Sequence, residues 1–231
     1  FNTPDFDRGD EALAFRMLME GEATYFQFKS AYARSGQEHL LAVELEARSA
    51  QPASLSPLAK DPSIPEFLVQ QIVAPYAKGP LFVHRVCASQ GTDALDALFK
   101  SPPTSSEQIL SPHKRLFPTR DAPSVLELPD LSDTFGPGTE LRARETFGEF
   151  GCRLIFKALT GDENLAACEG WDGDRAHAYA RPGEAWAALV WALTFDSEGD
   201  AIEFAEALRV AQQASQLAPP PPLTVADVSV A

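Results

Sequence analysis

Residues 12–29 read ALAFRMLMEGEATYFQFK and form the longest strongly apolar helical pattern in the chain. At 100° per residue, Glu22 falls at the edge of an apolar stripe, whereas Glu20 points roughly the other way, where its neighbours are also partly apolar. The helix is therefore predicted to be buried on more than one side. The stripe consists of Ala14, Leu18, Gly21, Tyr25, Phe28 and Tyr32.

The two carboxylates in this helix need an explanation. An unpaired buried carboxylate is costly, so such a group is normally paired, protonated or bound to a metal. One interpretation is an ion pair between Glu20 and Arg16, one turn earlier, with Glu22 held by a partner that the sequence does not reveal. The other is that this helix supplies a metal ligand.

Composition indicates a folded globular protein and excludes some partners. The chain has 231 residues, of which 45% are hydrophobic, and 33 acidic against 19 basic residues give a net charge of −14. This charge opposes binding to nucleic acid, and no run of 18 apolar residues indicates membrane insertion. We expect a single domain over 1–217, with a surface loop at 50–65, and an extended or disordered proline-rich tail at 218–231.

The periodicities predict an α+β fold that is mainly helical and has a small antiparallel sheet. The predicted strands cover 124–128, 176–180 and 186–195, and the last two form a hairpin closed by 181–184. The predicted helices begin at Asp7 or Asp10 and run to Arg34, then cover 37–49, 66–73, 92–99, about 139–159, a short segment opened by Asp162, and 198–213.

Local motifs limit the chemistry. Thr104 and Glu107 have the spacing of a helix capping box, which is a sufficient structural explanation for Glu107. No two histidines are four residues apart, and HExxH, GxGxxG, phosphate-loop and GxSxG motifs are absent. Three cysteines without a CxxC motif allow at most one disulfide.

Residues 19–26, MEGEATYF, resemble the second zinc-binding helix of gluzincin metallopeptidases, in which a glutamate of an NEGFATY-like segment is the third zinc ligand. Further motifs, in the same order, resemble a bacterial family of predicted, mostly extracytoplasmic zinc peptidases. These motifs span about 12–208 and are EGEAT at 20–24, PYAKGPLFV at 75–83, PPTSSEQILSP at 102–112, GEFG at 148–151, GWDGDR at 170–175 and FDSEGDAIEF at 195–204.

The resemblance implies a metallopeptidase-like core that packs the Glu20 helix in its middle, peptide-bond hydrolysis, and a location outside the cytoplasm. It implies zinc as cofactor, with Glu20 as a ligand and Glu22 as a group that orients a histidine ligand. Two residues are catalytic candidates and three are candidates for the cleft wall, although Asp174 and Arg175 are equally explained as a local ion pair at the start of a strand. The catalytic candidates are Glu107 and His113, and the cleft candidates are Glu149, Asp174 and Arg175.

Two departures from the family pattern concern function. The chain lacks HExxH, which supplies two zinc ligands and the general base, and Ser111 stands where the family motif has histidine. We expect the HExxH segment to lie upstream in a longer product or on another chain, so that zinc binds only when those histidines are supplied. The partners would then be a peptide or protein substrate and an N-terminal fragment carrying HExxH. The alternative is a catalytically inactive binding or assembly subunit.

Overall fold

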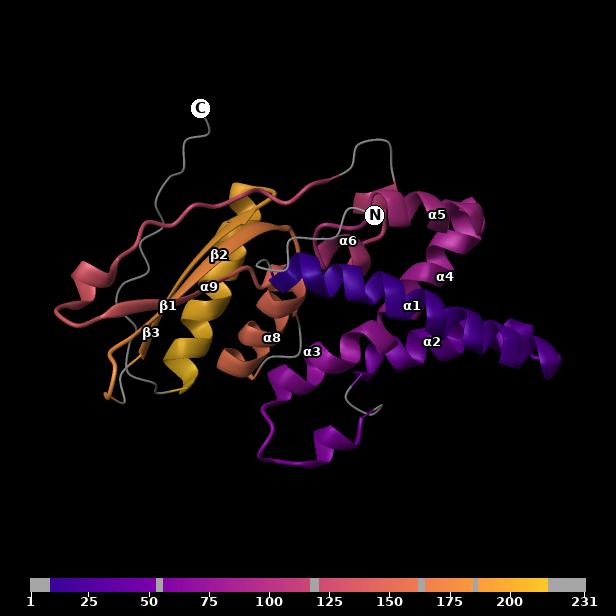
Figure 1. The fold of residues 1–231 in the computed structure, drawn as a ribbon, viewed down its shortest axis with the longest axis horizontal. Coiled ribbons are helices and arrows are strands. Elements are labelled where there is room, and N and C mark those ends of the chain that lie inside the picture. Colours follow the sequence, from indigo (N-terminus) through magenta and orange to yellow (C-terminus); the bar gives the residue numbers. More distant parts are fainter. Residues whose placement is uncertain (1–8, 53–55, 117–120, 162–164, 185–186, 216–231) are drawn as a thin grey trace.

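The computed structural model describes residues 9–52, 56–116, 121–161, 165–184 and 187–215, and it has the predicted α+β fold. Figure 1 shows a helical part built around α1, a sheet with α9 at the opposite end, and α8 between them. The α-helices are α1 (Gly9–Arg34), α2 (Leu41–Ala50), α3 (Glu66–Ala77), α4 (Gly79–Gln90), α5 (Asp93–Lys100), α6 (Glu107–Leu110), α7 (His113–Leu116), α8 (Gly148–Thr160) and α9 (Glu198–Ser215). Short 3-10 helices are η1 (Glu38–Leu40), η3 (Pro57–Lys60), η4 (Ser132–Phe135) and η5 (Leu165–Cys168).

Helix α1 organises the helical part, because it packs mainly on α3 and α4 and also contacts α2, α6 and α8. Its buried side chains belong to one hydrophobic core that extends from α2 to Phe150 of α8. The predicted apolar stripe is buried from Ala14 to Tyr25, whereas Phe28 and Tyr32, its last two members, are only partly buried. The buried side chains of α1 in this core are Leu13, Ala14, Met17, Leu18 and Tyr25.

Helix α1 is crossed closely by the junction between α3 and α4. A Cβ on Gly21 would lie 2.7 Å from the Gly79 Cα atom, and a Cβ on Gly79 would lie 2.9 Å from the Gly21 Cα atom. Both glycines therefore allow a backbone contact that no larger residue permits. They come from two of the motifs described above, EGEAT and PYAKGPLFV.

The sheet of the described residues has three antiparallel strands in the order β1 (Glu140–Glu145), β2 (Trp171–Ala180) and β3 (Ala187–Phe195). The predicted hairpin between the last two strands is confirmed, and Gly183 in its turn has a φ of 79°. Helices α8 and α9 pack against the strands around a second core. Its buried members are Cys152, Phe156, Ala167, Cys168, Trp171 and Phe204.

The prediction of a strand at 124–128 is wrong, and so is the helix start near 139. Residues 121–131 have no regular secondary structure, although the Ser124 N–H donates to the Asp172 carbonyl at 2.7 Å. Residues 140–145 pair with β2 instead. Their sequence, ELRARE, consists of good helix formers, so tertiary pairing overrides local propensity here. Helix α8 consequently begins only at Gly148.

Other boundaries also differ from the predictions. Asp10 lies inside α1 rather than before it, and α3 continues through Pro75 to Ala77. The prediction of a capping box is wrong. The Thr104 N–H donates to Gln108 Oε1 at 3.1 Å rather than to Glu107, and Glu107 contacts Lys114 instead. Asp7, Asp162 and the tail at 218–231 lie outside the described residues. None of the described helices combines the length and hydropathy that crossing a membrane requires.

Candidate functional site

Glu20 lies half-buried on α1, on the side that faces α3. Tyr76 of α3 lies next to it: desolvation and the nearby Glu20 charge raise the pKa of the Tyr76 hydroxyl. Among the described residues Glu20 forms no ion pair with Arg16, so that interpretation of the sequence is wrong. Glu20 and Tyr76 come from the same two motifs as the glycines of the helix crossing.

Glu22 lies on the other edge of α1 and faces α5. Partial burial, and then the charge of Asp96 on α5, raise the pKa of the Glu22 carboxyl. The helix separates Glu22 from the side that carries Glu20. The two carboxylates of the EGEAT motif are therefore not brought together.

Three of the other sequence candidates, Glu107, Glu149 and Asp174, lie close together in the fold, and a fourth carboxylate, Asp10, lies with them. Asp10, Glu107, Glu149 and Asp174, called here the acidic cluster, are each no more than 3% exposed. Asp10 lies within electrostatic range of Asp174 and Glu149. Glu149 in turn lies within electrostatic range of Glu107. Burial is the largest cause that raises the pKa of each of the four. Ten residues of α1 separate Asp10 from Glu20, a rise of about 15 Å.

Asp10 connects α1 to the N-terminal ends of α6 and α8. Its Oδ2 atom accepts the Ser106 N–H at 2.9 Å, and Ser106 Oγ accepts the Phe150 N–H at 3.0 Å. The Asp10 carboxyl group packs against the Cα atom of Gly148, which has a φ of 70°. Its Oδ1 atom is buried and has no hydrogen-bond partner among the described residues.

Asp174 caps α8 from the sheet. Its carboxylate accepts the Gly148 N–H at 2.9 Å, the Phe147 N–H at 3.0 Å and the Trp191 indole N–H at 2.8 Å. No ion pair joins it to Arg175 within the described part of the chain, so the predicted local pair is wrong. Because a carboxylate at a helix N-terminus is favourable, Asp174 has a sufficient structural role.

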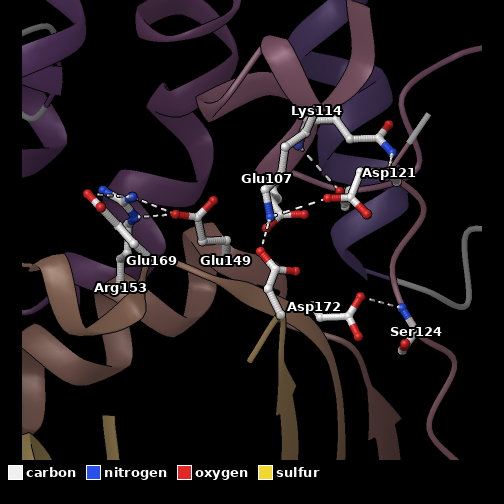
Figure 2. A network of polar contacts seen from close by, with 11 residues as sticks. Glu107, Lys114, Asp121, Ser124, Glu149, Arg153, Glu169 and Asp172 are labelled. Carbon is white, nitrogen blue, oxygen red and sulfur yellow. Dashed lines mark hydrogen bonds and ion pairs between the residues drawn. The ribbon is translucent and has the colours of Figure 1, made fainter. Parts of the chain in front are cut away.

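Glu107 is held by Lys114 of α7. Lys114 Nζ lies 2.7 Å from Glu107, 2.5 Å from Asp196 and 3.4 Å from Asp121, and Figure 2 shows this network beside Glu149. Burial raises the pKa of Glu107 to about 7, despite the opposing charge and hydrogen bond of Lys114. Glu107 can therefore exchange a proton near neutral pH.

Glu149 is held by Arg153, one turn later on α8. Its Oε1 atom accepts hydrogen bonds from Arg153 Nε at 2.9 Å and Nη2 at 2.5 Å, as Figure 2 shows. Its Oε2 atom is buried without a partner among the described residues. Glu149 is therefore a buried group, whereas the resemblance implies a position in a cleft wall.

The remaining candidates are His113, which lies outside the acidic cluster, and Arg175, which lines the same cleft as Asp10 and Asp174 of that cluster. His113 is exposed at the start of α7. Arg175 and Asp174 line a cleft of about 440 Å³, which lies between the first turn of α1, residues 122–127 and the start of β2. Two of the three cleft candidates thus line a cleft.

The described residues offer no complete metal site, because no group of three His, Cys, Asp or Glu residues is placed to hold a metal within them. Sequence reasoning missed Lys114, and it considered Asp10 only as a helix cap. Neither residue has a local signal, since their partners lie on other elements, up to 96 positions away.

Comparison with known proteins gives one match. Residues 137–226 are similar to a family described as a domain of unknown function, DUF8575. This range includes every strand of the described sheet with α8 and α9, and it excludes α1 and Glu20. No curated protein and no solved structure matches the chain.

Proposed function

We propose that this chain is the larger part of a zinc-metallopeptidase-like protein that hydrolyses peptide bonds. In this proposal, two histidines and the general base come from an HExxH segment on the same gene product or on another chain. Glu20 is the third zinc ligand. The observation that carries the proposal is the position of Glu20 on a helix face bordered by exposed apolar side chains.

The apolar border lies on α3. Leu68, Ile72 and Tyr76 recur at every fourth residue and are 49%, 51% and 44% exposed. Met19, next to Glu20 on α1, is 40% exposed. A helix with an apolar stripe can pack on such a surface, and a carboxylate at its border is a suitable oxygen ligand for zinc.

Within the described residues no group of three His, Cys, Asp or Glu residues is placed to hold a metal, so the proposal takes only Glu20 from this chain. We therefore derive no catalytic step for this chain by itself. Glu22 would act as an orienting group only if a histidine of the added segment reached the α5 side of α1. An extracytoplasmic location belongs to the same proposal.

A second candidate function is a binding or assembly subunit without catalysis. The same exposed stripe of α3 favours it, because contiguous apolar surface marks protein–protein contacts as well. The net charge of −14 would then present an acidic surface to a protein partner.

The deciding experiment isolates the protein together with any segment or polypeptide that carries HExxH. Zinc is measured by elemental analysis, and peptide hydrolysis is measured with a quenched fluorogenic peptide mixture. About one zinc per complex is expected, because a catalytic site of this type holds one ion. Glu20→Gln should remove the zinc, whereas Glu203→Gln, on the exposed face of α9, should retain it.

Two outcomes would contradict the peptidase proposal. The first is a complex that contains HExxH but no zinc. The second is a zinc content that Glu20→Gln leaves unchanged. Either result would favour the binding or assembly subunit.

A further inference from the structure

A second hollow of the molecule lies away from both Glu20 and the cleft beside Asp174. It is a pocket of about 220 Å³ between the end of α2, α3 and α8. Its charged lining consists of Lys78, Arg153, Lys157 and Glu66, and its apolar wall includes Phe150 and Leu154. Three cations against one carboxylate is the reverse of the overall composition, in which acidic residues outnumber basic ones by 33 to 19.

Lys78 is the residue that points most strongly to an anionic ligand. It is half-buried, and its Nζ atom donates to the Ser49 carbonyl at 3.2 Å. Among the residues that the structure describes, no carboxylate lies within ion-pair distance of Lys78. Burial and then repulsion from Arg153 lower the pKa of Lys78 to about 8. Since an ammonium group has three donors, Lys78 can still donate to an anion.

The other two cations of the lining each have a carboxylate partner. Arg153 is held by Glu149, and Lys157 lies 3.2 Å from Glu66. These pairs hold both side chains at the pocket, while Glu66 is the one carboxylate in the lining. Arg153 and Lys157 are thereby compensated by carboxylates, and the Glu149 charge also acts on Lys78, so Lys78 is the cation of the lining that has no carboxylate within ion-pair distance among the described residues.

The size of the pocket and the chemistry of its wall limit the class of ligand further. At about 220 Å³, the pocket is smaller than a typical site for a drug-sized ligand. Phe150 and Leu154 offer apolar contact beside the cations. A ligand that fits both is small, has one anionic end and carries an apolar group.

We propose that this pocket binds a carboxylate attached to an apolar group, with Lys78 as its main contact. The same chemistry occurs at the C-terminus of a peptide with an apolar last residue and in a free short-chain carboxylic acid. A site for a peptide C-terminus would deepen the proposed peptidase function. Binding itself requires neither zinc nor an added segment, so the two proposals can fail independently.

The experiment titrates the full chain with N-acetyl-leucine and follows binding by calorimetry and by amide NMR shifts. N-acetyl-leucinamide should bind at least about tenfold more weakly, because it loses a charge-assisted hydrogen bond. Acetate should also bind at least about tenfold more weakly, because it buries no apolar group. Hexanoate distinguishes the sources: tighter binding than N-acetyl-leucine indicates a free acid, and weaker binding indicates a peptide C-terminus.

Variants assign the binding to Lys78. Lys78→Met should weaken N-acetyl-leucine binding about tenfold or more, whereas Lys100→Met, on α5 outside the pocket, should leave it unchanged. Lys157→Gln, at the partly exposed side, gives a second test if Lys78→Met fails to fold. Equal binding of the acid and its amide, or shifts confined to other residues, would overturn the proposal.

Discussion

The carboxyl group of Asp10 occupies the position where any residue larger than glycine at 148 would place its Cβ atom. Gly148 also has a φ of 70°, a conformation that costs other residues about 1–2 kcal/mol. Gly148→Ala should therefore lower the free energy of unfolding by this strain and by a further 1–3 kcal/mol or so for overpacking. The measurement is urea denaturation.

A matched control for this prediction is Gly161→Ala at the end of α8. Gly161 has nearly the same φ, 69°, and no atom lies within 4 Å of the position that an added Cβ would take. For Gly161→Ala, the free energy of unfolding should therefore fall only by the strain contribution. Equal losses in the two variants would show that contact with Asp10 does not constrain Gly148.

A second prediction at the residue scale concerns the pH dependence of stability. Glu107 has a pKa of about 7 in the folded protein against 4.5 when unperturbed, so the folded state binds more protons between these values. Stability therefore falls as pH rises through this range. Glu107→Gln should reduce that fall by up to about 3 kcal/mol, measured by urea denaturation at pH 5 and pH 8. An unchanged difference would show that Glu107 is ionised throughout.

At the scale of elements, the crossing of α1 with the α3–α4 junction depends on glycine. Gly21 lies inside a helix, where replacement by Ala would by propensity alone stabilise the protein by about 1 kcal/mol. The contact with Gly79 opposes this, because the new Cβ would overlap backbone atoms. Gly21→Ala should therefore destabilise the protein by at least about 1–3 kcal/mol, measured by thermal unfolding.

Gly199→Ala in the first turn of α9 is the control for helix propensity. Its nearest neighbour to an added Cβ is Ser197 Oγ at 3.5 Å, which is an ordinary contact. This variant should be neutral or slightly stabilised. A stabilised Gly21→Ala protein would mean that the helices separate easily at the crossing.

At the scale of the whole molecule, helix α8 joins two hydrophobic cores. Phe150 belongs to the core around α1, and Phe156 belongs to the core beneath the sheet. If 1–217 is one domain, both cores should unfold together. All three tryptophans, at 171, 186 and 191, lie in the sequence of the sheet part, so their fluorescence reports on it separately from helical circular dichroism.

Leu45→Ala tests this cooperativity, because Leu45 is fully buried in the core around α1. The substitution should cost about 2–5 kcal/mol and shift the fluorescence and circular dichroism transitions equally. A fluorescence transition that does not move would divide the chain into two folding units. The similarity to a family over 137–226 alone makes this a direct test of the single-domain prediction.

The sequence alone was sufficient for the features that depend on local periodicity. The long α1 pattern, the final helix and the β2–β3 hairpin all follow from side-chain repeats and turn residues next to one another in the chain. The α+β class follows from their sum. Glu107, Glu149 and Asp174 were candidates through the resemblance of their motifs, and the fold brings these three together.

Only the tertiary structure decided which residues these three carboxylates contact and where the sheet begins. ELRARE at 140–145 favours a helix locally, but hydrogen bonds to β2 make it a strand, while 124–128 finds no strand partner among the described residues. Asp10, Lys114 and Lys78 acquire their environments from elements far away in the sequence. Burial of a charge depends on the atoms packed around it, and a linear pattern does not contain that arrangement.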